Sequence, residues 1–479
     1  MLFNSGAFLL FMLIVWVVHW TVAARSARLQ NVVLLVASAV FYGMADIRFL
    51  VLLTFSALVN YALGSRIAGL PEGTARSRWF WLGVTLNLGT LIYFKYFNFF
   101  LTGVVQLLGS FGLELEPGTL VVLLPLGISF YTFQMLGYLI DIQHEETEPC
   151  KDPVDFLTYV LYFPKMLAGP IERAQRFLPQ IAVTRVLDPQ LIGDGMRQIL
   201  WGLFAKVVIA DDLNEYVNNV FDNYTEHGSI TLLFGVMLYL IQIYCDFSGY
   251  SNIALGVSKL LGVRLMLNFA YPLFGTNISD FWRKWHISLT TWMIDYVFTP
   301  LSFLLRDKGK LGLVISISVT FLAVGIWHGA NWTYVLFGVL QSIYFIPLAL
   351  SQGINKASAY SLTSRLPTFG QTWRMLFMFV LMSLTFGLLR APSLAHAAAM
   401  ASGIFTSPQI AVTRWVPAMI MVPILVLILV EWMQRSKDHA LQLDRAKWPA
   451  WSRYTIYLVI AELVLWKSGK EADFIYFQF

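Results

Sequence analysis

Long uninterrupted apolar runs constrain this chain more than any other feature. Hydrophobic residues make up 57% of the 479 residues and charged residues only 13%, against about 25% in a typical soluble protein. That much apolar surface cannot be hidden in soluble cores. The runs are continuous rather than alternating, which disfavours a transmembrane barrel. The sequence therefore predicts an all-α polytopic membrane protein.

Runs of about twenty apolar residues mark the candidate transmembrane helices. They lie near residues 6–23, 30–45, 49–64, 79–101, 119–140, 154–168, 190–210, 229–248, 250–266, 311–327, 331–350, 372–389, 414–432 and 451–467. Some runs are short, so we expect about eleven true crossings, with the others re-entrant or interfacial. No internal repeat and no long polar linker is visible, so residues 1–479 are predicted to form a single membrane domain.

Basic residues in short loops set the expected orientation. Arg25 and Arg28 follow the first span and Arg66, Arg76 and Arg78 follow the third, so both loops are predicted to be cytoplasmic. The N-terminus then lies outside, and its apolar run lacks the features of a cleaved signal peptide. The net charge of +5 fits basic cytoplasmic loops. No basic stripe lies on a soluble module, so no nucleic-acid partner is expected.

The segment FWRKWHISLTTW, residues 281–292, sets His286 among tryptophans. Its apolar positions recur at spacings of three, four and three, as on one face of a helix: Trp282, Trp285, Leu289 and Trp292. Tryptophans on one face and basic residues on another are typical of a helix at the membrane interface, so an interfacial anchor is one interpretation. A catalytic role for His286 is the other, because histidine exchanges a proton near neutral pH.

The segment GIWHGANW, residues 325–332, places His328 at the end of a predicted span. Helical spacing would put Asn331 and Trp332 on the same face as this histidine. A neutral imidazole there can accept a proton from a hydroxyl group. A packing histidine bonded to a backbone carbonyl is the structural alternative. An ionisable side chain at membrane depth is a functional candidate by default, and the second histidine strengthens that interpretation.

Two further polar insertions interrupt apolar runs. Residues 242–252 form a dense polar group that includes Asp246 and Tyr250, and Asp246 needs a partner if it is buried. Residues 164–173 break a run with proline and glycine and then add charge, as segments that line a cavity do. A polar network that fastens helices is the structural alternative for the first insertion, and an interfacial turn for the second.

Several motifs of other function classes are missing from the sequence. It contains no phosphate-binding glycine loop, no paired-histidine metal motif and no nucleophile elbow, so neither nucleotide-driven transport nor a metal site is indicated. Cys150 and Cys245 stand in different surroundings and suggest no disulfide framework. Matching broken helices in two halves are not seen, which weakens a secondary-transporter interpretation.

The ordered motifs together resemble the membrane-bound O-acyltransferase family, and within it the bacterial alginate O-acetyltransferase branch. The resemblance covers nearly the whole chain and rests on LPLGISFYTFQ (124–134), FPKMLAGPIER (163–173), QIYCDFSGYS (242–251), DFWRKWH (280–286), WHGANW (327–332) and DFIYFQF (473–479). One departure follows YVFTP (296–300), where this chain continues LSFLLRD and the branch usually has leucine, paired glycines, asparagine and arginine. That departure concerns the acceptor or partner rather than the histidines.

The resemblance implies many helices around a central funnel or tunnel through the membrane. It implies two catalytic histidines, His328 as the family's essential residue and His286 as its second active-site position. We expect His328 to act as general base and His286 to orient the donor or stabilise charge. The residues expected to contact substrate are Asn331, Trp327, Trp332, Asp246, Tyr250, Trp285 and Gln134.

The implied activity is transfer of an acetyl group from a cytoplasmic thioester to an exported, alginate-like polysaccharide or to a periplasmic acetyltransferase partner. The donor would be acetyl-CoA or an acyl-carrier protein, with no bound cofactor. The setting would be the bacterial inner membrane, with membrane lipid and the polysaccharide export machinery as further partners.

Three alternatives remain from the sequence. The chain could transfer D-alanyl or another acyl group from a carrier protein to a cell-envelope polymer. It could be a non-catalytic transporter of the acyl group, or a scaffold subunit of an export complex. Thioester hydrolysis by the purified protein would separate an enzyme from a transporter.

Overall fold

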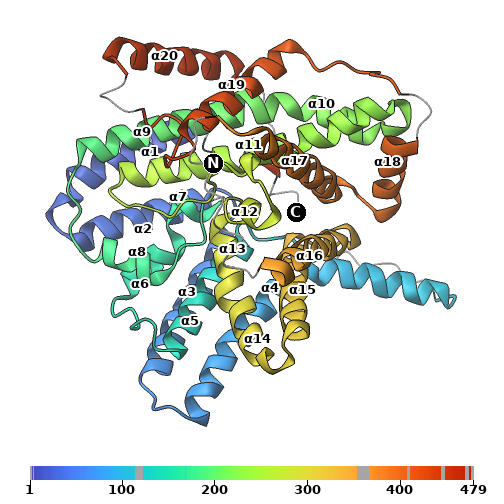
Figure 1. Cartoon of the computed structure of the whole chain (residues 1–479). Coiled ribbons are helices and arrows are strands. Elements are labelled where there is room, and N and C mark those ends of the chain that lie inside the picture. Colours follow the sequence, from blue (N-terminus) through green and yellow to red (C-terminus); the bar gives the residue numbers. More distant parts are fainter. Residues whose placement is uncertain are drawn as a thin grey trace. The chain divides into compact units, whose positions relative to one another are not determined.

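The computed structural model describes residues 3, 5–113, 122–167, 169–352, 366–406, 410–443, 448–469 and 474–475. Every regular element in these ranges is helical, which confirms the predicted all-α class (Figure 1). Among these residues, six helices are long and apolar enough to cross a membrane, and four shorter apolar helices accompany them. The chain is a polytopic membrane protein. The number of crossings and the central funnel stay predictions.

The helices group into two compact units. Unit 1 comprises Met1–Leu167, Ile171–Leu187 and Leu261–Leu265, and unit 2 comprises Ala168–Pro170, Asp188–Leu260 and Met266–Phe479. The single membrane domain over residues 1–479 stays a prediction.

Unit 1 is built from helices of the first part of the chain. Its elements are α1 (Gly6–Trp20), η1 (Ala23–Arg25), α2 (Ala27–Gly43), α3 (Ile47–Ala68), α4 (Thr74–Ser110), α5 (Ile128–Gln143), α6 (Pro153–Leu161), α7 (Phe163–Met166) and α8 (Ala174–Ile181). Helix α2 packs against α1, α3 and α6, and α5 packs against α3 and α4. The run predicted near 154–168 is divided at Tyr162, where the backbone leaves the helical region before α7 begins at Phe163.

Unit 2 contains the remaining helices. Its elements are α9 (Pro189–Leu203), η2 (Phe204–Ala210), α10 (Asp211–Asp222), η3 (Tyr224–Glu226), α11 (Ser229–Leu260), η4 (Pro272–Phe274), α12 (Ile278–Trp282), α13 (Ile287–Met293), η5 (Ile294–Phe298), α14 (Thr299–Leu304), η6 (Arg306–Lys308), α15 (Lys310–His328), α16 (Trp332–Gln352), α17 (Phe369–Arg390), α18 (Leu394–Thr406), α19 (Ala418–Gln434) and α20 (Ala450–Lys467). Helix α11 is largely buried and packs against α9, η2, α10 and α17.

Helix α11 corrects one prediction. The runs near 229–248 and 250–266 were expected to be two spans, but Ser229–Leu260 is one continuous helix. The polar residues between them do not break the helix, because neighbouring groups satisfy them. Asp246 Oδ1 accepts a hydrogen bond from Lys206 Nζ at 2.6 Å, and Asn252 Nδ2 donates to the carbonyl oxygen of Ser248 at 2.8 Å.

Close backbone approach between α9 and α11 depends on a pair of glycines. A Cβ atom on Gly202 would lie 2.5 Å from the carbonyl oxygen of Gly249, and a Cβ on Gly249 would lie 2.8 Å from the carbonyl oxygen of Gly202. Small residues let membrane helices pack at this separation. The same contact holds η2, which continues α9, against α11.

The hairpin of α15 and α16 positions the C-terminal end of α15. A Cβ atom on Gly325 would lie 2.3 Å from the carbonyl oxygen of Tyr334, so only glycine permits the observed approach of the two helices. Helix α15 ends at His328, and α16 begins at Trp332 after a short turn. The sequence GIWHGANW is therefore the tip of a tightly packed hairpin.

Candidate active site

A break in the helical segment around His286 sets the geometry of the site. Helix α12 ends at Trp282 and α13 begins at Ile287, so the predicted continuous amphipathic helix is wrong. His286 adopts the left-handed conformation, with φ 44° and ψ 54°, which costs of order 1–3 kcal/mol for a non-glycine residue. The tryptophans at 282, 285 and 292 are buried rather than exposed on one face.

Hydrogen bonds to a neighbouring extended segment hold the break in place. The backbone N–H of Ile287 donates to the carbonyl oxygen of Asn268 at 2.9 Å, and Ser288 Oγ donates to Asn268 Oδ1 at 2.8 Å. The backbone N–H of Ala270 donates to the carbonyl oxygen of Lys284 at 3.0 Å. Asn268 is buried, and it was not among the residues predicted from the sequence. The feature that could have identified it is a polar side chain within the mostly apolar run RLMLNFAY, residues 264–271.

The structure brings the two predicted catalytic histidines against the same indole ring. The ring centroid of Trp327 lies 5.5 Å from that of His286 and 5.0 Å from that of His328. His286 is 1% exposed and His328 is 5% exposed. Phe247 covers His286 edge-on at 4.7 Å, and Phe337 covers His328 at 5.7 Å. The sequence did not single out these two phenylalanines.

Burial determines the charge state of His286. Desolvation lowers the pKa of its imidazole well below the ordinary value, and the nearby His328 lowers it further. His286 is therefore neutral near pH 7, with one ring nitrogen as a donor and the other as an acceptor. A neutral imidazole in an aromatic enclosure can donate a hydrogen bond to developing negative charge.

Trp282 and Trp285 form an aromatic wall in unit 2 together with Phe281 and Phe337. Trp282 Nε1 donates to Gln341 Oε1 at 3.0 Å, and its ring lies 6.3 Å from that of Phe337. Trp285, a predicted substrate contact, stacks on Phe281 at 5.5 Å. Its hydrophobic neighbours give Trp285 a packing role in unit 2, and its contact with substrate stays a prediction.

A cavity of about 120 Å³ opens beside this wall. Residues of α12, α13 and α15 line it, among them Trp282, Thr290 and Val324. That volume has room for a few water molecules or a small organic group, since a water occupies about 30 Å³ in the liquid. Neither His286 nor His328 is among its lining residues, so this cavity is separate from the two buried imidazoles.

Asn331 and Trp332 lie differently from the predicted helical face. Because α15 ends at His328 and α16 starts at Trp332, the three residues do not share one helix. Asn331 Oδ1 accepts a hydrogen bond from the backbone N–H of Thr333 at 3.1 Å, and its Nδ2 donates to the carbonyl oxygen of Pro392 at 3.0 Å. Asn331 therefore caps α16, and Trp332 is 64% exposed.

Asp246 has the buried partner that the sequence required. Lys206 Nζ lies 2.6 Å from Asp246 Oδ1 and 2.8 Å from Asp211 Oδ1, and all three side chains are almost fully buried. The backbone N–H of Ile475 donates to Asp246 Oδ2 at 2.8 Å. Sequence analysis did not single out Lys206, which η2 presents from inside an apolar run.

Tyr250 and Gln134 are the remaining residues that were predicted to contact substrate. The ring of Tyr250 lies 4.5 Å from that of Phe474, next to the Asp246 cluster. Gln134 is buried in α5 of unit 1. The rest of the C-terminal motif at 473–479, beyond Phe474 and Ile475, lies outside the described residues. Within the ranges that the structure describes, no three His, Cys, Asp or Glu side chains gather as ligands of a metal ion.

Comparison with known proteins matches this chain to one family. Residues 78–391 match the family described as MBOAT, membrane-bound O-acyltransferase family. A probable alginate O-acetylase AlgI of Pseudomonas putida is 36% identical over 348 residues, which is 72% of this chain and 70% of that protein. A peptidoglycan O-acetyltransferase of Helicobacter pylori is 31% identical over 372 residues, 72% of this chain and 69% of that protein.

A more distant similarity extends to another acyl transfer. A teichoic acid D-alanyltransferase of Bacillus subtilis is 30% identical over 228 residues, 46% of this chain and 57% of that protein. The matched family region contains both His286 and His328. The chain belongs to the membrane-bound O-acyltransferase family and is an enzyme of that family.

Proposed function

We propose that this enzyme transfers an acetyl group from a thioester donor to a hydroxyl group of a cell-envelope polysaccharide. The observation that carries the proposal is the buried pair of imidazoles, His286 and His328, each in contact with the indole ring of Trp327. Both come from segments held by hydrogen bonds or close helix packing. Acyl transfer needs a base for the attacking hydroxyl and a donor for the developing oxyanion.

In the proposed reaction His328 takes the proton of the acceptor hydroxyl. The hydroxyl oxygen attacks the thioester carbonyl, and His286, as a neutral imidazole, donates a hydrogen bond to the oxyanion that forms. When this tetrahedral intermediate collapses, the newly formed carbon–oxygen bond remains as the ester and the carbon–sulfur bond of the donor breaks. The leaving thiolate takes up the proton held by His328. The products are the acetyl ester and the free thiol.

The identity of donor and acceptor is proposed from chemistry and similarity. The names of two of the relatives specify acetyl transfer, and each alignment covers more than two thirds of both chains. We propose acetyl-CoA or an acetylated carrier protein as donor. We propose an exported, alginate-like polysaccharide, or a periplasmic acetyltransferase that completes delivery, as acceptor. The setting would be the bacterial inner membrane.

Transfer of a D-alanyl group from a carrier protein is the second candidate. The similarity to the teichoic acid D-alanyltransferase supports it, although that alignment covers 46% of this chain. The two candidates differ in the acyl group that the enzyme accepts. An enzyme that transfers D-alanyl groups would consume a carrier-bound D-alanyl donor, whereas an acetyltransferase would leave that donor unchanged.

The test uses purified full-length protein in liposomes with radiolabelled acetyl-CoA, acetylated carrier protein or D-alanyl carrier protein. We expect thiol release from an acetyl donor and label on an added polysaccharide, both lost in His328→Ala. Consumption of only the D-alanyl donor would favour the second candidate. Failure of every donor to release thiol, with folded protein, would contradict acyl transfer by this chain alone.

A further inference from the structure

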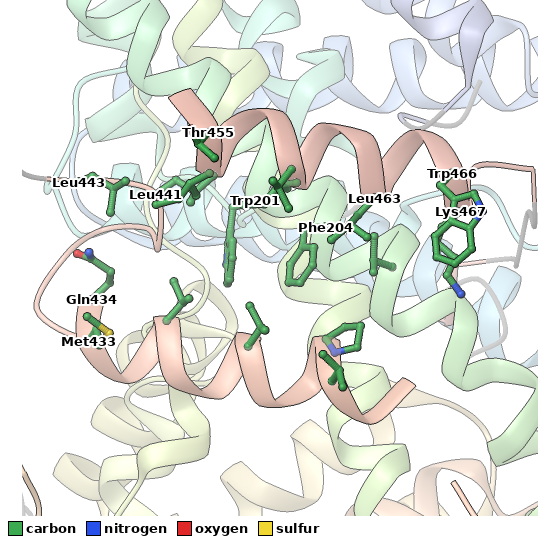
Figure 2. Close-up of a pocket in the computed structure, with 18 of the residues that line it drawn as sticks. Trp201, Phe204, Met433, Gln434, Leu441, Leu443, Thr455, Leu463, Trp466 and Lys467 are labelled. Carbon is green, nitrogen blue, oxygen red and sulfur yellow. The ribbon is translucent and has the colours of Figure 1, made fainter. Parts of the chain in front are cut away.

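A cavity with neither catalytic histidine in its lining lies between the last two helices of unit 2. It has a volume of about 690 Å³ and is lined by α19, α20 and the junction of α9 with η2. Figure 2 shows α19 and α20 on opposite sides of the space, with Trp201 and Phe204 projecting between them. All lining side chains are apolar except Gln434, Thr455 and Lys467.

Fixed contacts on both sides keep the two helices apart. The hydroxyl of Tyr244 in α11 donates to both carboxylate oxygens of Glu431 in α19 at 2.9 Å, and these side chains are buried. Lys467 at the end of α20 forms an ion pair with Asp212 of α10. Both helices also pack on η2. The gap is therefore part of the packed structure, and its lining suits an apolar occupant.

The residues around the cavity indicate that its occupant comes from the lipid bilayer. Helix α19 is one of the shorter apolar helices of this membrane protein, and its residues Val422 and Val426 both line the cavity and are exposed. On α20, Val459 does the same. A cavity with exposed apolar side chains in its lining, in a membrane protein, fits an acyl chain of the bilayer.

The two ends of the cavity differ in charge. At one end Lys467 is neutralised by Asp212. Toward the other end, marked by Gln434, Leu441 and Leu443 in Figure 2, the described residues that follow α19 carry two basic side chains, Arg435 and Lys437, against one acidic side chain, Asp438. Basic loops of this kind face the cytoplasmic leaflet, which holds anionic lipid.

A second group of cations lies at the same end. Arg197 is one helical turn before Trp201 on α9, so the two share a face. Arg197 Nη2 lies 3.0 Å from Asp194 Oδ1, and Lys259 Nζ lies 2.6 Å from Asp194 Oδ2. Two cations share this one carboxylate, which leaves an excess positive charge. His439 also contacts Asp194 and stands two residues before Leu441 of the lining.

We propose that this cavity binds one acyl chain of an anionic phospholipid, whose phosphate lies at the end near Arg197 and Lys259. The apolar lining takes the chain, and the excess positive charge selects the headgroup. The site is separate from the two histidines in its residues, so the proposal does not depend on the proposed acetyl transfer.

Native mass spectrometry of the purified full-length protein tests the cavity. The protein in mild detergent is mixed with equal amounts of phosphatidylglycerol and phosphatidylethanolamine. We expect one retained phospholipid, predominantly phosphatidylglycerol. Val426→Trp fills the cavity and should lower retention at least about tenfold, or about 1.4 kcal/mol. Leu425→Trp is the matched control, because Leu425 is 58% exposed and does not line the cavity.

A second pair on α20 protects the test against a folding defect. Val459→Trp should lower retention, whereas Leu458→Trp, on an exposed residue outside the lining, should not. All variants are first checked for a monodisperse peak and a wild-type unfolding temperature. Equal retention by the wild type and both cavity-filling variants, or no retained lipid in the wild type, would overturn the site.

Removal of one cation tests the headgroup assignment. Arg197→Gln should reduce the preference for phosphatidylglycerol over phosphatidylethanolamine while the total of bound lipid stays within twofold of the wild type. Equal retention of the two lipids by the wild type would overturn the choice of an anionic headgroup. An unchanged preference in Arg197→Gln would overturn the place assigned to the phosphate.

Discussion

The imidazole of His286 lies against the indole of Trp327, with their ring centroids 5.5 Å apart, although the two come from different helical segments. The same indole contacts His328, so a single aromatic ring fixes both histidines. The break before α13 supplies one imidazole and the tip of the α15–α16 hairpin supplies the other. Changes in either support should therefore alter turnover without removing a histidine.

Asn268 is the first such support. Asn268→Ala removes the acceptor of the Ser288 hydroxyl, which lies two residues from His286. Because misplacement by about 1 Å can slow a reaction about 10²-fold, we expect kcat to fall by roughly that factor, with a smaller change in KM. Steady-state thiol release measures both constants. Asn268→Asp keeps an oxygen acceptor and should recover much of kcat. A change in KM alone would argue against positioning.

Gly325 is the second support. A Cβ atom there would meet the carbonyl oxygen of Tyr334 at 2.3 Å, so Gly325→Ala must separate α15 from α16 and displace His328. Overpacking of this kind costs about 1–3 kcal/mol, and the unfolding temperature should fall together with kcat. Gly89→Ala in α4 is the control, since a Cβ there meets nothing within 4 Å. Equal unfolding temperatures and equal kcat values in the two variants would contradict the close packing of α15 against α16.

Lys206 is the shared cation of two buried acidic side chains, Asp246 and Asp211, and its loss should destabilise unit 2. Lys206→Met leaves Asp246 and Asp211 without their shared cation, which typically costs about 3–5 kcal/mol in a buried site. Thermal unfolding in detergent should show a lower midpoint. Addition of Asp246→Asn and Asp211→Asn to the same chain removes the unpaired charges and should restore part of the loss. An unchanged midpoint in the single variant would contradict the role of the ion cluster.

Asp211 should make stability depend on pH. Burial raises its pKa from 3.8 to about 7, although Lys206 opposes the rise. Between these values the folded protein holds a proton that the unfolded chain releases, so this group's contribution is complete below about pH 4 and is lost as pH rises through about 7. Asp211→Asn cannot titrate. The wild type should therefore lose more stability than the variant between pH 5 and pH 8, and parallel losses would contradict this assignment.

The sequence predicted the composition of the site better than its shape. The prominence of His286, His328 and Asp246 followed from ionisable residues standing in apolar surroundings. In unit 2 all three side chains are buried, His286 against Trp327 and Asp246 against Lys206. The membrane class followed from the apolar runs in the same way, because about twenty apolar residues suffice to span a bilayer.

Local conformation was harder to predict, for identifiable reasons. Spacing alone made residues 282–292 a helix, but a hydrogen-bonded neighbour, Asn268, stabilises the left-handed residue that breaks it. Polar residues made 229–266 look like two spans, but Lys206, far away in sequence, satisfies Asp246 within one helix. Both outcomes depend on tertiary contacts that periodicity does not contain. Asn331 similarly became a cap because α16 starts one residue later.

The most direct test of the account is the rate of thioester cleavage by His328→Ala. General base catalysis is worth about 10²–10⁴-fold, so thiol release and acetyl transfer should fall at least by that range. His396→Ala, which removes a histidine of α18 outside the site, should keep the wild-type rate. With both variants equally folded, loss only in His328→Ala is the predicted result. Near-native acetyl transfer by His328→Ala would contradict the central claim.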